Sequence, residues 1–374
     1  MPTQDVSVAR HFAGLPDPRV DRTKKHRLDD ILVIALCAVI CGADSFDEIE
    51  RFGKVRHDWL KRFLALPNGV PSHDTFNRVF SALDRDRFSA CFASWMAGLC
   101  EAVGLRQVAV DGKALRAAPA DTFSGCLHLV NAWAVENRLF LGQAAVAEGS
   151  HEIAALPELI RVLDLRGALV TIDAAGCQKE VVKQIRGQGG HYLVAVKGNQ
   201  PSLHEAEQAV FDRAVETDFR GVRHDTHEQV DEGHGRSEER YAAVIYEPRG
   251  LPGGWEGVRA VVYVGREREV RGRNVSTSHY YITSHAGTAE ELAGLARGHW
   301  GVENGLHWCL DVTFREDECR TRDANAGANL GAIRRVAASL LKQDPGKGSI
   351  KAKRYNAALD GEYLLKVLRG FAQD

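Results

Sequence analysis

The sequence predicts an α/β (α+β) fold, in which a mixed sheet with a strand-rich insertion is preceded and followed by helical regions. Two observations indicate this arrangement. Apolar residues recur at every third or fourth position in the first hundred residues and again after residue 289, as they do in amphipathic helices. Between these regions, short aliphatic runs end in Asp, Gly or Asn and alternate with helical stretches, which is typical of a sheet covered by helices.

Size and composition indicate a globular protein. The 374 residues suffice for two or three domains, and 44% hydrophobic and 26% charged residues are ordinary values. The longest apolar run, Ile31–Ile40, is too short to cross a bilayer, so we expect a buried helix and no membrane partner. No signal peptide is recognisable, and the eight cysteines form no C-x-x-C pair. We therefore expect reduced thiols, no structural zinc and a cytoplasmic location.

The distribution of charge says more than the total. A formal net charge of −2 argues mildly against a nucleic-acid-binding protein. However, residues 319–358 contain nine Lys or Arg and only two Asp. A second basic cluster lies near the N-terminus, at Arg19, Arg22, Lys24, Lys25 and Arg27. Each cluster can be solvated surface charge or a DNA contact, and the sequence leaves both interpretations open.

Residues 1–104 are expected to be helical. Phe46, Ile49 and Phe52 follow helical spacing, and Pro71-Ser72 before the next apolar series is typical of a capped helix start. Two short helices around the turn at 66–70 would form a helix-turn-helix-like unit. Many all-helical domains show the same spacing, so the pattern alone leaves the role of this region open.

The pattern changes at residue 105. Strands are expected at 107–112, 128–133 and 139–146, then a helix at 153–163, a strand at 168–173, a helix at 179–185 and a strand at 192–196. This β-β-β-α-β-α-β order is that of a ribonuclease H-like core, which we place at 105–320. The insertion spans about 201–285, with a helix at 201–218 and short strands at 241–246, 258–264 and 280–284. A helix at 289–312 follows, and then a basic helical tail at 321–374 that includes a helix at 328–342.

Three carboxylates stand where metal-dependent phosphoryl chemistry needs them. Asp111 and Asp173 each end a predicted core strand, and Glu303 lies within a predicted helix. Mg²⁺ prefers oxygen ligands, and two such ions can activate an attacking hydroxyl and stabilise a departing oxyanion. A single Asp at a strand end is usually a turn or cap residue. Two aspartates, each after a predicted strand, leave both interpretations open: turn or cap residues, and metal ligands.

The context of Glu303 favours the catalytic interpretation. Residues 297–314, RGHWGVENGLHWCLDVTF, closely resemble the glutamate helix of insertion-sequence DDE transposases, in the ISAs-type branch that contains the H-repeat-associated proteins. The resemblance covers nearly the whole chain. It extends to ordered blocks at 71–76 (PSHDTF), 110–113 (VDGK), 172–174 (IDA), 196–200 (VKGNQ) and 233–236 (GHGR).

The resemblance implies a function. Asp111, Asp173 and Glu303 would be the catalytic metal ligands for two Mg²⁺ ions, for which Mn²⁺ can substitute. The protein would bind double-stranded DNA at the element's ends and at the target, cleave the ends and transfer the strand, acting as a homodimer on paired ends and associated with the nucleoid. The alternatives are a catalytically inactive or repurposed DNA-binding protein and a stand-alone nuclease of the same fold.

The chain departs from the wider superfamily around Glu303. Many relatives carry Tyr, Arg and Lys where this sequence has Ala296, His299 and Leu310. His299 can contact DNA as a weaker, pH-dependent donor, or it can pack against Trp300 or a core carbonyl. Other candidate DNA-binding residues are Lys113, Lys197, His234, Arg236, Trp300, His307 and Asp311.

Most of these candidates also have a structural interpretation that does not involve DNA. His307 and Asp311, at four and eight residues after Glu303, can contact a phosphate or the metal ligands, or form a buried polar pair. Trp300 and Trp308 fit the core better than base stacking. Lys113 and Lys197 can meet phosphates. The segment with His234 and Arg236 can be a DNA contact or a plain surface turn.

Overall fold

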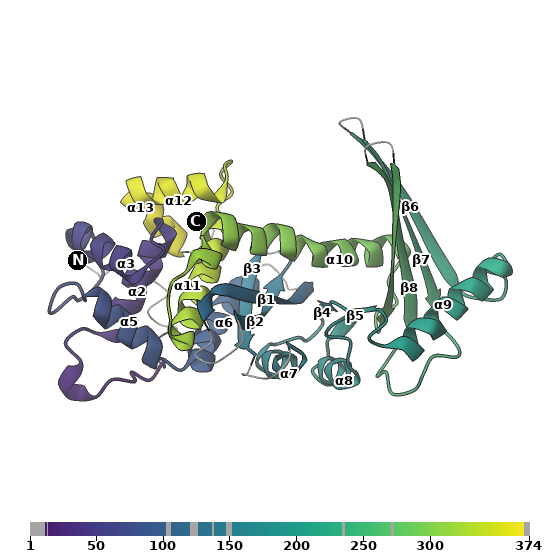
Figure 1. The fold of residues 1–374 in the computed structure, drawn as a ribbon, viewed down its shortest axis with the longest axis horizontal. Helices are drawn as coiled ribbons and strands as arrows, with labels where there is room; N and C mark the ends of the chain where they lie inside the picture. Colours follow the sequence, from purple (N-terminus) through teal and green to yellow (C-terminus); the bar gives the residue numbers. More distant parts are fainter. Residues whose placement is uncertain are drawn as a thin grey trace. The chain divides into compact units, whose positions relative to one another are not determined.

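A computed structural model describes residues 12, 14–101, 106–119, 126–136, 138–146, 152–233, 236–270 and 273–369. The chain divides into two compact units, whose elements are labelled in Figure 1. Unit 1 comprises Met1–Leu105, Gly112–His151 and Val302–Asp374, and unit 2 comprises Arg106–Asp111 and Glu152–Gly301. Strand β1 (Gln107–Pro119) contributes residues to both units.

Unit 1 is mainly helical. Its α-helices are α2 (Leu28–Ile40), α3 (Phe46–Val55), α4 (His57–Leu60), α5 (His73–Ala82), α6 (Arg85–Glu101), α11 (Ala324–Gln343), α12 (Ile350–Leu359) and α13 (Gly361–Arg369), with a short 3₁₀ turn η1 (Asp21–Thr23). Helix α2 is buried from Asp30 to Ile40, as expected of a helix that is apolar on all sides. Helix α11 packs against α2, α5, α6 and strand β3 (Leu139–Ala145) and is buried from Ala326 to Leu341.

Serine caps fix helix starts in this unit. Ser72 accepts a hydrogen bond from the Thr75 backbone N–H and begins α5, which confirms the helix start predicted there. Ser45 and Glu48 form a reciprocal capping box at the start of α3. The expected helix-turn-helix-like unit corresponds to α4 and α5, but α4 has only four residues.

The structure shows that several residues of the two basic clusters are buried or paired with acidic groups. Helix α11 lies in the core of unit 1 rather than in a basic tail, and its Arg334 and Arg335 are almost fully buried. They pair with groups inside the protein, so they cannot form an exposed DNA-binding surface. In the N-terminal cluster, Arg19, Lys24 and Arg27 are paired with Asp17, Asp21 and Asp29 respectively, which offsets their charges.

The strands of the described residues form a nine-stranded mixed sheet in the order β3-β2-β1-β4-β5-β9-β8-β7-β6. Strands β2 (Cys126–Ala134) and β3 form an antiparallel hairpin in unit 1. In unit 2, β4 (Leu169–Ile172) runs parallel to both β1 and β5 (His191–Val196). Helices α7 (Glu152–Val162) and α8 (Lys179–Gly187) connect the parallel strands. The ribonuclease H-like order predicted from the sequence is confirmed.

The insertion extends this same sheet. After α9 (Pro201–Glu216) come β6 (His224–Gly233), β7 (Arg236–Tyr246), β8 (Ala260–Val270) and β9 (Arg273–Thr283), and Figure 1 labels β6, β7 and β8 among its long strands. They are longer than the short strands expected, and β6 was not anticipated because its sequence is almost entirely polar. Strand β9 pairs antiparallel with β5 and so joins the insertion to the core.

Helix α10 (Ala289–Val302) packs on one face of the unit 2 sheet. Its Ala289, Leu292 and Ala296 join a core cluster with residues of β4, β5 and β7–β9. Figure 1 shows α7 and α8 on the other side of β4 and β5. No helix of the described residues is long and apolar enough to span a membrane.

Two local expectations were wrong. Strand β1 does not end in a turn at Asp111–Gly112 but continues to Pro119. Only Gln107–Val110 pair with β4, so Asp111 marks the end of that pairing rather than the end of the strand. The helix expected at 289–312 is α-helical only to Val302 and continues as the π-helical turns η2 (Glu303–His307) and η3 (Cys309–Thr313), followed by the 3₁₀ turn η4 (Glu316–Glu318).

Candidate active site

Asp111 and Asp173 occupy neighbouring positions at one edge of the unit 2 sheet. The last register pair between β1 and β4 is Val110 with Ile172, and each aspartate is the next residue in its chain. Neighbouring strands lie about 4.8 Å apart, so the two backbones are side by side at this point. Both aspartates are partly exposed, and Asp173 Oδ1 accepts a hydrogen bond of 3.1 Å from the Gly176 N–H.

The last turns of α10 are held directly on these two strands. Gln107 of β1 donates from Nε2 to the Leu295 carbonyl at 2.7 Å and to Thr171 Oγ1 of β4 at 3.1 Å. A Cβ added at Gly298 would lie 2.4 Å from Gln107 Oε1, so a larger residue there would displace the Gln107 amide that bonds the helix to the strands. Helix α10 is therefore fixed over the strands that carry Asp111 and Asp173.

His299 belongs to the same contact. Its Nδ1 lies 3.2 Å from Thr171 Oγ1, and burial lowers the pKa of the imidazole although the charge of Asp173 opposes this shift. A neutral, internally bonded imidazole is a poor phosphate ligand at neutral pH. The geometry therefore favours packing over the DNA contact for His299.

A partly exposed group of basic and aromatic side chains lies near the end of β5. Lys197 follows β5 and is exposed. Burial lowers the pKa of His279, and the positive charge of Lys197 lowers it further. The His279 ring centroid is 5.6 Å from that of Trp300, whose side chain is 39% exposed rather than in the core. Sequence analysis missed His279, because nothing in the pattern of β9 indicated which strand it would pair with.

The remaining candidates lie in unit 1 or outside the described residues. Lys113 is buried and its Nζ lies 2.5 Å from Asp311 Oδ1, so it is not an exposed phosphate ligand as expected. His307 is half-buried, and Trp308 is 59% exposed, so it too is outside the core. His234 and the side chains of Arg236 and Glu303 lie outside the described part of the structure.

The donor set at the sheet edge suits a hard divalent cation. Two partly exposed carboxylates on adjacent strands offer the oxygen ligands that Mg²⁺ and Mn²⁺ prefer. The described side chains contain no cluster of three His, Cys, Asp or Glu that could hold a metal ion, and the side chain of Glu303 is not among them.

Comparison with known proteins identifies the family. Residues 9–96 match a family model described as DDE_Tnp_1-associated, and residues 103–340 match the model described as Transposase DDE domain. The chain belongs to the DDE transposase family. The transposase is 37% identical over 369 residues to the "H repeat-associated putative transposase YhhI" of Escherichia coli strain K12, covering 96% of this chain and 97% of that relative. The branch suggested by the sequence motifs is thereby confirmed.

The chain is also similar to a shorter relative and to one solved structure. The "Inactive transposase YbfQ" of the same strain is 44% identical over 71 residues, which are 19% of this transposase and 84% of that protein. A piggyBac transposase in a synaptic complex with hairpin DNA, solved by cryo-EM, aligns with 97% of this chain and 79% of its own at 10% identity. The TM-score of 0.37 is too low for any argument from that structure.

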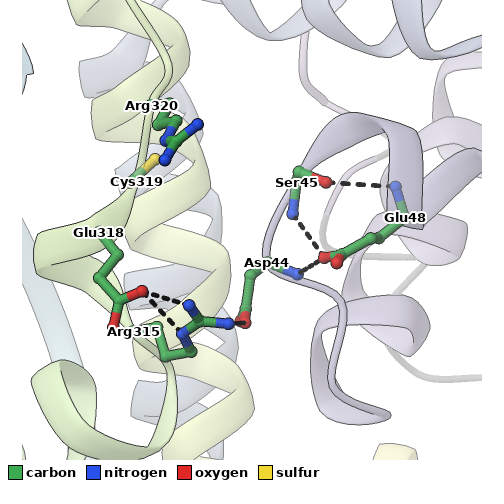
Figure 2. Close-up of a pocket in the computed structure, with 7 residues that line it drawn as sticks. All are labelled: Asp44, Ser45, Glu48, Arg315, Glu318, Cys319 and Arg320. Carbon is green, nitrogen blue, oxygen red and sulfur yellow. Dashed lines mark hydrogen bonds and ion pairs between the residues drawn. The ribbon is translucent and has the colours of Figure 1, made fainter.

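A separate cavity of about 520 Å³ lies in unit 1 (Figure 2). Figure 2 shows Arg315 between Glu318 and Asp44 on its wall, and Ser45 bonded to Glu48. Cys319 also lines the cavity. Burial raises the pKa of its thiol, but Arg334 and Thr321 stabilise the thiolate, and the net shift of the pKa is downward. Arg315 pairs with Glu318 and lies 4.0 Å from Asp44, and we assign no ligand to this cavity.

Proposed function

We propose that this transposase cuts DNA at the ends of an insertion sequence in a metal-dependent reaction and joins the freed 3′-hydroxyl to target DNA. The observation that carries the proposal is the register of β1 and β4, which makes Asp111 and Asp173 neighbours. The family and the fold agree with this assignment.

In the proposed site, Asp111, Asp173 and Glu303 hold two Mg²⁺ ions, for which Mn²⁺ can substitute. When bound, such ions activate an attacking hydroxyl and stabilise the departing oxyanion. Helix α10 supports the third ligand, because Glu303 follows His299 by four residues, about one helical turn. The Gly176 N–H holds one oxygen of Asp173 and thereby orients the carboxylate.

The DNA partner is expected at the same sheet edge. Lys197 is exposed there and can neutralise a phosphate, and the exposed face of Trp300 can stack on a base. Two copies of the transposase would hold the two ends of the element, in the cytoplasm at the nucleoid. The helical region 1–104 would bind the end sequence.

The test is a cleavage assay on duplex DNA that carries the element's terminal inverted repeat. We expect cleavage with Mg²⁺ or Mn²⁺ and none with a chelator. Asp111→Ala, Asp173→Ala and Glu303→Ala should each abolish cleavage while thermal stability and end binding stay near wild type. Asp164→Ala, which removes an exposed partner of Arg166, is the matched control and should cleave normally. Near wild-type cleavage in any of the three variants would remove that residue from the site.

The alternative is a transposase that binds DNA without cutting it, and the relative named as inactive keeps this possibility in view. The same assay decides, because an inactive protein would bind the ends but cleave with neither metal.

A further inference from the structure

A chain of buried charges links distant parts of unit 1. Lys113 of β1 pairs with Asp311 of η3 at 2.5 Å and lies 4.0 Å from Glu316 of η4. Glu316 in turn receives two hydrogen bonds from Arg335 of α11, at 2.6 and 3.3 Å. The side chains of Glu316 and Arg335 are fully buried, and that of Lys113 is 7% exposed.

Two further hydrogen bonds complete the chain. Arg335 Nε donates to Asn131 Oδ1 of β2 at 2.7 Å, and its Nη1 also donates to the Gly331 carbonyl at 3.0 Å. Buried ion pairs of this kind rarely add net stability compared with apolar residues of the same size. Such pairs do favour one arrangement of the helices and strands, the one in which each buried charge has a partner. This is the property expected of residues that position a segment.

The segment held by these charges begins at Glu303. The π-helical turns η2 and η3 replace regular α-helix here, and such turns are frequent at functional sites. Three cations fasten the segment to the rest of unit 1. Lys342 of α11 donates to the Gly305 carbonyl at 2.7 Å, Lys113 holds Asp311, and Arg354 of α12 donates to the Thr313 carbonyl.

We propose that Lys113 and Asp311 are positioning residues for the cleavage reaction, which fix the segment that begins at Glu303 against strand β1. Lys113 follows Asp111 by two residues, about 7 Å along an extended strand. Asp311 lies eight residues after Glu303, in the second of the two π-helical turns. The ion pair thus joins the two stretches of chain that carry these acids. This inference rests on the proposed function.

The test compares Lys113→Met, Asp311→Asn and the double variant with wild type. We expect kcat for cleavage to fall by about a hundredfold in Lys113→Met, as for an ångström-scale misplacement of catalytic groups. The Mg²⁺ concentration for half-maximal rate should rise, while the affinity for DNA ends stays unchanged. The double variant should be no slower than the slower single variant, because both changes break the same pair.

Controls separate positioning from general instability. Glu318→Gln breaks the exposed pair with Arg315 on the same segment and should leave kcat and the Mg²⁺ dependence at wild-type values. Melting temperatures give the folded fraction of each variant. If Lys113→Met does not fold, Asp311→Asn decides, because the Asp311 side chain is one-third exposed and the change removes the charge that pairs with Lys113.

The proposal is overturned if the folded variants show wild-type kcat and Mg²⁺ dependence, if activity falls only with the folded fraction, or if the two single effects add in the double variant. Failure of the proposed function looks different. In that case Asp111→Ala and Glu303→Ala themselves would cleave at wild-type rate.

Discussion

His299 of helix α10 and Thr171 of strand β4 are joined through Nδ1 and Oγ1 at 3.2 Å. This contact ties the helix that precedes Glu303 to the strand that precedes Asp173. It favours packing over a DNA contact for His299, because the ring is engaged inside unit 2 and its pKa is lowered by burial.

His299→Ala should therefore reduce stability rather than change the pH dependence of cleavage. Losing one hydrogen bond and its packing should cost roughly 1 kcal/mol of unfolding free energy. Because the folded pKa lies below the unfolded value near 6.5, the neutral imidazole stabilises the fold fully above that pH, and this contribution is lost as pH falls through the folded pKa.

This prediction is checked by measuring denaturation of wild type and His299→Ala from pH 5 to pH 8. Cleavage rates are measured over the same pH range. The gap in stability between the two proteins should be widest above pH 6.5. A pH profile of cleavage that His299→Arg flattens would instead support a DNA contact.

Glu207 of α9 should make stability depend on pH in the opposite direction. Burial raises the pKa of this carboxyl well above its usual value, and neither oxygen has a hydrogen-bond partner among the described residues. The protonated form is favoured in the fold, so stability is complete below the unfolded pKa near 4.5 and is lost as pH rises through the folded pKa. Glu207→Leu should therefore stabilise the protein at pH 8, by roughly 1–3 kcal/mol.

Urea denaturation from pH 4 to pH 9 measures the effect. The midpoint for wild type should decline with rising pH more steeply than that for Glu207→Leu. An equal decline in both proteins would show that Glu207 is not buried as a neutral acid.

The Arg335–Glu316 pair should show strong coupling in stability. Removing Arg335 alone leaves a fully buried carboxylate without its hydrogen-bond donor and with only Lys113, 4.0 Å away, as a nearby cation, so Arg335→Met should cost roughly 3–5 kcal/mol. Adding Glu316→Gln removes that orphaned charge, and the double variant should be more stable than the sum of the single effects predicts. A double-mutant cycle of denaturation midpoints measures the coupling. Simple additivity would contradict the buried pair.

DNA affinity should fall with salt despite the net charge of −2, and exposed lysines should carry this dependence. Lys197 is exposed beside the candidate site, so Lys197→Ala should reduce the slope of log affinity against log salt by about 0.9 for one phosphate contact. Lys24→Ala is the control, since its charge is already offset by Asp21, and the slope should stay the same. Equal slopes for wild type and Lys197→Ala would remove Lys197 from the interface.

Local patterns along the chain determined much of this protein. The uniformly apolar run at 31–40 specified a buried helix, Ser72 specified the start of α5, and the aliphatic runs before Asp111 and Asp173 specified the strands of the core. These features depend on side-chain spacing within about twenty residues, which the sequence displays directly. The ordered motifs around Glu303 indicated the family, and the comparisons confirm it.

Only the tertiary structure decided the environment of the charged and polar side chains. Lys113 and Asp311 are 198 residues apart, and no local pattern marks them as a pair. Arg334 and Arg335 appear basic and exposed in the sequence, yet they lie in a core where distant groups satisfy them. The polar strand β6 exists because β7 pairs with it residue by residue. Charge pairing and strand pairing are long-range contacts, and their energy depends on the neighbours that folding brings together.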